Sequence, residues 1–134
     1  MVSTVEALMK ITDYKKGHPT DAGIDIPLAE DITIKPGETK RVQLPLEGLS
    51  LPTGIMGIPF VRTKFADKIL VGSTIIDPLY TGPVHVWITN ASYLPVSFEK
   101  GTAIVQIVFI YFSMRTDISS KTSEPRGYER DTTE

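Results

Sequence analysis

The chain has 134 residues, and its 14 Lys and Arg against 16 Asp and Glu leave a formal net charge of −2. This length allows one domain with one core, and without a basic surplus we expect no nucleic-acid partner. The absence of cysteine excludes disulfides and thiolate chemistry, and no apolar run approaches the roughly 20 residues of a spanning helix, so we expect a soluble protein with no membrane partner.

The N-terminal residues and the spacing of Gly and Pro bear on location and on secondary structure. The N-terminus lacks a basic region followed by an apolar stretch, so we expect no secretory signal and an intracellular location. Ten Gly and ten Pro are spread along the sequence. Between Pro19 and Gly101 the longest window free of both is about 12 residues, roughly three helical turns. Strands are therefore the simpler interpretation of this region.

Between these breaks, apolar and polar residues alternate with the period of a half-buried strand. The alternation is regular at residues 42–46 and 84–88. Residues 103–112 are almost wholly apolar, which is typical of a strand buried on both faces. A short helical turn fits residues 63–68, between two apolar segments that we expect to be strands.

The number of short strands decides the expected fold class. Many short strands with turn signals at regular intervals predict an all-β domain of the jelly-roll kind, over residues 1–113. Composition changes over residues 114–134, where nine residues are charged and few are apolar. Such a segment cannot bury enough surface to offset its ordering entropy, so we predict a flexible C-terminal tail.

Two segments in the first half carry polar side chains that could belong to a site. In residues 20–26 (TDAGIDI), Asp21 and Asp25 flank a small Ala-Gly pair. A turn that enters a strand is the simpler explanation of this pattern. At the start of residues 62–68 (RTKFADK), the cations Arg62 and Lys64 and the hydroxyl of Thr63 follow an apolar strand. Free backbone N–H groups at such a junction suit a phosphate, although a solvated strand end is the simpler alternative.

Two further segments lie in the second half. In residues 72–82 (GSTIIDPLYTG), we expect a hairpin in which an apolar strand delivers Asp77 to a turn, with Tyr80 close behind. Asp-Pro is common turn chemistry, but a carboxylate beside an aromatic ring would also form a sugar-binding corner with a general base. Gln106 lies within an apolar strand, where a buried amide needs a partner. That partner could be a core residue or a ligand.

The order and spacing of the four segments resemble the first four motifs of the homotrimeric dUTPase family. The likeness covers about residues 4–112, and the third segment is its most specific part. The small size and cysteine-free composition most resemble the dUTPases of viruses and mobile elements. The matching segments are residues 21–26, 62–68, 75–82 and 101–106.

The resemblance implies Mg²⁺-dependent hydrolysis of dUTP to dUMP and pyrophosphate, on a distorted jelly roll whose three active sites lie between the subunits of a homotrimer. By position, Asp77 would be the catalytic residue that orients and deprotonates the attacking water. Tyr80 would pack against the deoxyribose and reject ribonucleotides. Asp25 would orient waters on the Mg²⁺, which would be bound mainly by phosphates and water.

The remaining positions implied by the resemblance contact the base and the phosphates. The uracil would be read by the backbone around Ile75, Ile76 and, across from them, His85. The phosphate chain would be held by Arg62, Thr63 and Gln106, with Arg126 of the tail at the terminal phosphate.

Three departures from the family pattern bear on activity. Lys64 stands where the family usually has glycine, and it could either clash with the phosphates or add a cation. The chain between Lys68 and Asp77 is about two residues shorter than is typical, so we expect a reshaped hairpin. The tail keeps Arg126 but lacks the stacking aromatic and the later glycines of the fifth motif, and its acidic residues would repel a triphosphate. We therefore expect reduced turnover, because lid closure excludes water.

Two alternatives to a dUTP diphosphatase remain open at this stage. One is a catalytically weak or inactive dUTPase-like protein that acts as a nucleotide- or protein-binding module, suggested by Lys64 and the altered tail. The other is the deamination of another nucleotide, such as dCTP, although relatives that do this have a different second motif.

Overall fold

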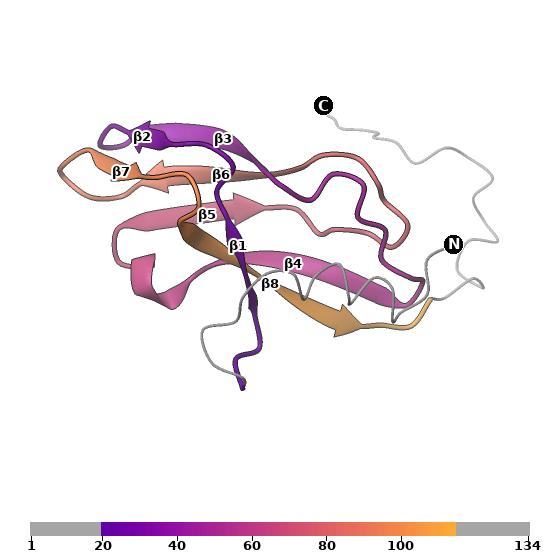
Figure 1. The fold of residues 1–134 in the computed structure, drawn as a ribbon. Helices are drawn as coiled ribbons and strands as arrows, with labels where there is room; N and C mark the ends of the chain where they lie inside the picture. The colour runs from indigo at the N-terminus through magenta and orange to yellow at the C-terminus, as the bar shows by residue number, and fades with distance from the viewer. Residues whose placement is uncertain (1–19, 115–134) are drawn as a thin grey trace, which may run out of the picture.

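The computed structural model describes residues 20–114, which form three antiparallel sheets. The larger sheets have the strand orders β1-β8-β4 and β3-β6-β5, and a small sheet pairs β2 with β7. In Figure 1 the two larger sheets lie as layers, with β2 and β7 at one end. In chain order the elements are β1 (Ile24–Pro27), β2 (Ile32–Ile34), β3 (Thr39–Leu44), β4 (Ile55–Val61), the 3-10 turn η1 (Thr63–Phe65), β5 (Ile69–Ser73), β6 (Val84–Asn90), β7 (Val96–Phe98) and β8 (Ala103–Tyr111).

The predictions of an all-β domain and of a short helical turn are confirmed for these residues. The predicted tail lies outside the described residues apart from Met114, so the expectations for Arg126 stay untested. Within residues 20–114, no helix is long and apolar enough to cross a membrane.

The core lies between the two layers and is built from alternate residues of their strands. On β6, Val86 and Ile88 are fully buried, whereas Trp87 between them is 40% exposed. On β8, the consecutive residues Ile104 and Val105 are both fully buried. The expected burial on both faces is therefore confirmed for the first part of β8, but its last residues are exposed. Strand β6 buries one face where the two layers meet, as the period-two pattern predicts.

The loop 74–83, which connects β5 to β6, is attached to β4 in the other layer. Ile76 forms an isolated antiparallel bridge with Gly57, with N–H to O distances of 2.8 and 3.0 Å. The predicted hairpin is confirmed, but the strand before Asp77 is shorter than predicted, because β5 ends at Ser73. Beyond that point the chain leaves β6 and pairs with β4 instead, which gives the loop a fixed position.

The 3-10 turn η1 connects β4 to β5 and carries part of the second polar segment. Phe65 packs edge-on against Phe98, with 5.4 Å between ring centroids and an interplanar angle of 84°. This contact holds one side of the turn against the protein. Thr63 and Lys64 remain exposed on the other side.

Candidate active site

The first group of polar residues lies where β1, β8 and β4 adjoin. β8 is the central strand, and its Gln106 faces Asp25 on β1 and Phe60 on β4. Side chains of cross-strand partners lie on the same face of a sheet. Arg62 follows β4 directly, so the order of three strands brings together residues that are far apart in the sequence.

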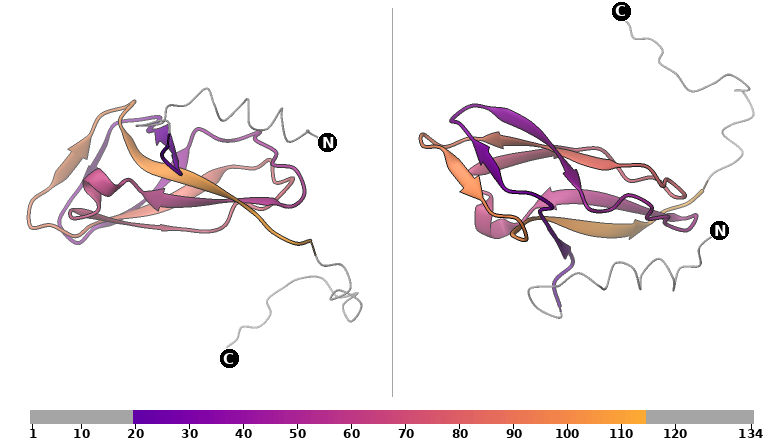
Figure 2. Two further views of the ribbon diagram at one scale, coloured as in Figure 1. Left: turned by 90° about the horizontal axis from the view of Figure 1, so that it is seen from below. Right: turned by 45° about the horizontal axis from the view of Figure 1, so that its top comes forward.

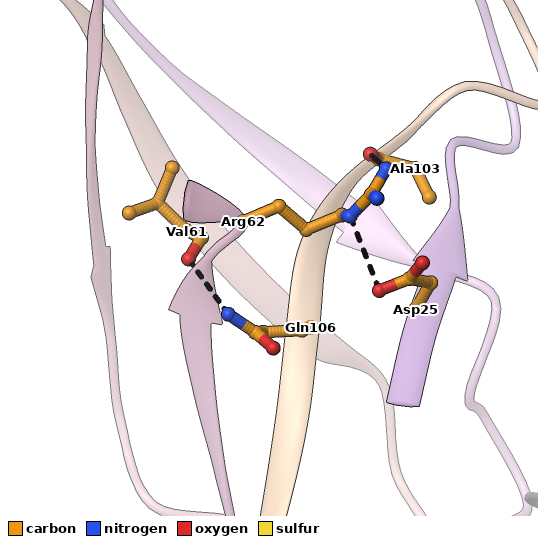
Figure 3. Close-up of polar contacts among 5 residues, drawn as sticks. All are labelled: Asp25, Val61, Arg62, Ala103 and Gln106. Atoms are coloured by element: carbon orange, nitrogen blue, oxygen red, sulfur yellow. Dashed lines mark hydrogen bonds and ion pairs between the residues drawn. The ribbon is translucent and has the colours of Figure 1, made fainter. Parts of the chain in front are cut away.

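Arg62 and Gln106 are fixed by contacts across these strands, as Figure 3 shows. The Arg62 Nε lies 3.2 Å from Asp25 Oδ1, and the Arg62 Nη1 donates to the Ala103 carbonyl at 3.0 Å. Gln106 Nε2 donates to the Val61 carbonyl at 3.1 Å. Gln106 is only half-buried, and the partner of its amide is a backbone oxygen of the neighbouring strand. The planar guanidinium connects β1 to the start of β8.

These side chains border a cavity of about 380 Å³, which we call the Arg62 cavity. Gly23 lies beside it, and a Cβ at that position would overlap Gln106 Oε1. The small Ala-Gly pair in the sequence therefore leaves room for the glutamine amide. The residues lining the Arg62 cavity are Asp21, Ala22, Asp25, Arg62, Thr63, Lys64 and Gln106.

The second group of polar residues lies on the loop 74–83. Asp77 opens a tight turn that is closed by the Tyr80 N–H donating to the Asp77 carbonyl at 3.3 Å. Leu79 has a φ of +65°, a conformation that a non-glycine residue adopts only at an energetic cost. Its N–H donates to the Leu51 carbonyl at 2.8 Å, which helps to hold the turn in this form. Asp77 and Tyr80 are therefore presented by a rigid and strained segment, as is common at functional sites.

The ring of Tyr80 is fixed by its own loop. Its hydroxyl donates to the Pro83 carbonyl at 2.6 Å. A Cβ on Gly82 would lie 2.7 Å from the Tyr80 Cζ, so only glycine leaves space for the ring in this position. The tyrosine is still 43% exposed, and its ring remains accessible to a ligand.

These residues border a second cavity of about 380 Å³, the Asp77 cavity. Strand β6 forms one wall. Strand β6 begins at Val84, but its hydrogen-bonded pairing with β5 begins only at Val86, opposite Ser73. Among the described strands, Val84 and His85 pair only with β3, so this end of β6 turns one edge toward the cavity. The lining residues are Thr74, Ile75, Ile76, Asp77, Tyr80, Pro83, Val84, His85 and Trp87.

Trp87 also lines this cavity, although the sequence motifs gave it no role. The alternation at residues 84–88 already puts it on the same face of β6 as His85, opposite the buried valines and isoleucine. An aromatic residue on the outward face of a strand beside a candidate site is the signal that could have identified it.

The two cavities lie at opposite ends of β4. Ile76 pairs with Gly57, five residues before Arg62, a separation of about 16 Å at 3.3 Å per residue. Because the bridge is antiparallel, the chain beyond Ile76 runs away from Arg62. Figures 1 and 2 show η1 at one end of β4 and the loop 74–83 at the other. Within one chain, Asp77 therefore does not reach a group held beside Arg62.

The donor set suits Mg²⁺ only if a ligand supplies further oxygens. Among the described residues, no three His, Cys, Asp or Glu side chains are grouped as a metal cage. Two carboxylates, from Asp21 and Asp25, line the Arg62 cavity together with two cations. Mg²⁺ usually retains waters and is held by one or two carboxylates plus substrate phosphates, and the residues of this cavity fit that mode of binding.

Comparisons with known proteins bear on the family and the fold of the chain. A model of the dUTPase family matches residues 9–130. The deoxyuridine 5'-triphosphate nucleotidohydrolase of Corynebacterium jeikeium is 33% identical over 99 residues, which are 70% of this chain and 63% of that protein. The corresponding protein of Saccharomyces cerevisiae is 31% identical over 117 residues, 81% of this chain and 79% of that one.

A dCTP deaminase of Pyrococcus horikoshii is 35% identical over 88 residues, 65% of this chain and 56% of that protein. The chain thus spans less than two thirds of the length of this relative and of the C. jeikeium relative. Among solved structures, the dUTPase of Staphylococcus bacteriophage 80alpha with dUpNHpp matches with a TM-score of 0.69 and 20% identity, covering 87% of this chain and 84% of that one. This likeness supports the jelly-roll fold.

Proposed function

The chain belongs to the dUTPase family, and from this premise we propose that it hydrolyses dUTP to dUMP and pyrophosphate. The observation that carries the proposal is the rigid turn that presents Asp77 and Tyr80 to one cavity. The reaction breaks the bond between the α- and β-phosphates by attack of a water. Because this substrate is an intracellular nucleotide, we propose that the protein acts inside the cell.

Asp77 is the proposed catalytic residue. Its carboxylate can accept hydrogen bonds from both a water and the sugar 3′-hydroxyl, so it can orient the water and take its proton. Tyr80 offers an apolar ring to the deoxyribose. The hydrogen bond of its hydroxyl to the Pro83 carbonyl holds the ring in place, so the ring cannot move aside to make room for a 2′-hydroxyl. Tyr80 therefore acts in the choice of sugar.

The base is read, in this proposal, at the end of β6. The backbone edge at Val84 and His85 lies beyond the β5 ladder and is available to an added hydrogen-bonding partner. Both backbone groups of Ile76 already bond to Gly57, so its contribution is to anchor the loop while Ile75 lines the cavity. The hydrogen-bonding edge of uracil can pair with the β6 backbone at the residues that β5 does not reach, beyond Ser73.

The phosphates are assigned to the Arg62 cavity. Arg62 and Gln106 are already held in position by other strands, and the exposed Thr63 and Lys64 add a hydroxyl and a second cation. Lys64 therefore acts as an added phosphate contact. Asp25, with Asp21 beside it, would hold the waters of a phosphate-bound Mg²⁺, which when bound supplies charge neutralisation to the triphosphate. We assign the terminal phosphate to Arg126 of the tail at 114–134, beyond the β domain at 1–113.

A homotrimer is the proposed assembly, with each active site shared between chains. The Arg62 cavity of one chain and the Asp77 cavity of another would have to meet on one nucleotide, because the general base must lie within hydrogen-bond reach of the attacking water. The separation along β4 within one chain is the observation that supports sharing.

Pyrophosphate release from dUTP and Mg²⁺ by the purified full chain tests the proposal. We expect turnover that is abolished by a chelator and reduced about 10²- to 10⁴-fold in Asp77→Asn, which loses the general base. Asp67→Asn is the matched control, since Asp67 is exposed and lines neither cavity. Release by Asp77→Asn at the wild-type rate would refute the assignment. Ammonia release from dCTP in the same panel would instead favour the deaminase activity of the archaeal relatives.

A further inference from the structure

Trp87 is the aromatic residue of the Asp77 cavity that the proposed function leaves without a role. It lies on β6 between Val86 and Ile88, which are both fully buried, yet its own side chain is 40% exposed. Its side chain lies on the same face of β6 as the side chain of His85. The largest aromatic side chain of the protein therefore lies at the cavity wall and not in the core.

The neighbours of Trp87 on the sheet leave one flank of the indole open. Its partner on β5 is Gly72, and its partner on β3 is Arg41. Because Gly72 has no side chain, nothing from this β5 position covers the indole, although a Cβ there would lie at an ordinary 3.9 Å from the Trp87 Cβ. The packing would therefore tolerate a side chain at position 72, and the flank of the indole is open because the residue there is glycine.

The Asp77 cavity contains two aromatic rings at different distances from the turn. Tyr80 belongs to the turn that carries Asp77, and Trp87 lies farther along β6, beyond His85. A nucleoside has two parts, a sugar and a planar base. With the sugar at Asp77 and Tyr80, a base directed along the edge of β6 extends toward Trp87.

We propose that the indole of Trp87 packs against the uracil ring and is a substrate-contacting residue of this cavity. The inference rests on the proposed function, because it takes the sugar position from Asp77 and Tyr80. An aromatic face attracts the face of any base and does not distinguish hydrogen-bonding edges. Trp87 therefore contributes affinity for the base, while the β6 backbone contributes the choice of base.

The first experiment uses the fact that Trp87 is the only tryptophan of the chain. The emission of the wild-type full chain is recorded during titration with dUMP, with excitation at the red edge of the indole band, where uracil does not absorb. We expect dUMP to quench the emission in a saturable manner and pyrophosphate to leave it unchanged. Unchanged emission with dUMP, or equal quenching by pyrophosphate, would overturn the proposal.

The second experiment compares variants of one aromatic position with a distant one. We expect Trp87→Ala to raise the KM for dUTP about tenfold with little change in kcat, and Trp87→Phe to recover most of the loss. The control is Tyr93→Ala, because Tyr93 is 98% exposed in the loop after β6 and lines neither cavity. A KM for Trp87→Ala within twofold of wild type would contradict the base contact.

The two proposals fail in different ways. If dUTP is not hydrolysed but dUMP still quenches the emission, the diphosphatase assignment fails and the contact of Trp87 with the base stands. If dUTP is hydrolysed and dUMP leaves the emission unchanged, the role of Trp87 fails alone. Should Trp87→Ala not fold, the wild-type titration and Trp87→Phe still decide the question.

Discussion

Arg62 and Lys64 line the same cavity, but their side chains are held in different ways. Arg62 is fixed by Asp25 and by the Ala103 carbonyl. Lys64 is exposed, and its Nζ lies 5.5 Å from the centroid of the Phe65 ring. Such a contact at an exposed site contributes only about 0.5–1 kcal/mol, so Lys64 can leave the ring for a phosphate at low cost. The cavity thus combines one preorganised cation with one mobile cation.

Gly82 is the residue whose substitution tests whether Tyr80 selects the sugar, as proposed. In Gly82→Ala the new methyl would lie 2.7 Å from the Tyr80 Cζ, so the ring must move away from Pro83. We expect the ratio of kcat/KM for dUTP to that for UTP to fall roughly tenfold, because a displaced ring no longer excludes the 2′-hydroxyl. Steady-state kinetics with both nucleotides measure this ratio.

Gly72→Ala is the matched control for Gly82→Ala. A Cβ at Gly72 meets nothing closer than 3.9 Å, and this glycine lies on β5, away from the turn. We expect its sugar selectivity to equal that of the wild type. Equal selectivity in both variants would show that Gly82 does not position the ring.

At the scale of elements, two consecutive residues of the loop 74–83 have different roles: one anchors the loop to β4 and the other lines the cavity. Ile76 is 4% exposed and bonds to Gly57, whereas Ile75 is 51% exposed and lines the Asp77 cavity. We expect Ile76→Ala to lower the free energy of unfolding by about 2–4 kcal/mol, since it removes buried methyl groups and leaves a cavity. Urea unfolding measures this loss.

Ile75→Ala deletes the same atoms from the neighbouring position. We expect it to change the free energy of unfolding by less than about 1 kcal/mol, because the side chain is half exposed, and to raise the KM for dUTP. Equal losses of stability in the two variants would mean that the loop is not anchored through Ile76.

The elements differ in how well the sequence could predict them. Strands β6 and β8 follow from local patterns, because alternate residues of β6 enter the core and the start of β8 is buried on both faces. Strands β2 and β7 have three residues each, too few for a period to be visible. The bridge of Ile76 to Gly57 depends on a partner far back in the chain, so no local pattern indicates it.

The candidate site shows the same division between local and distant information. The Asp77 to Tyr80 turn could be predicted because Asp-Pro is local turn chemistry. The pair of Arg62 and Asp25 could not, because it depends on β8 lying between β1 and β4. Residue types thus indicated what each segment could bind, and strand order decided which segments share a cavity.

At the scale of the whole molecule, one chain carries two candidate cavities that lie at opposite ends of β4. The anchor of the Asp77 loop and Arg62 are about 16 Å apart along β4, far beyond the reach of a hydrogen bond. Closed symmetry resolves this, because a ring of identical chains brings one patch of each chain against a different patch of the next. In the proposed homotrimer, activity belongs to the assembly and not to the single chain.

Mixing two inactive variants tests this sharing directly. Arg62→Ala removes the guanidinium from the Arg62 cavity, and Asp77→Asn removes the proposed general base from the Asp77 cavity. Each homo-oligomer is therefore expected to be inactive. When the two chains are unfolded together and refolded in equal amounts, random assortment should give roughly a quarter of the sites both intact halves, and about that share of wild-type pyrophosphate release. The matched control replaces the Arg62→Ala chain with one carrying both substitutions, which offers no intact Asp77 and should recover nothing. If the mixture of single variants is as inactive as this control while circular dichroism shows folded protein, each site is built from one chain and the shared-site assembly is wrong.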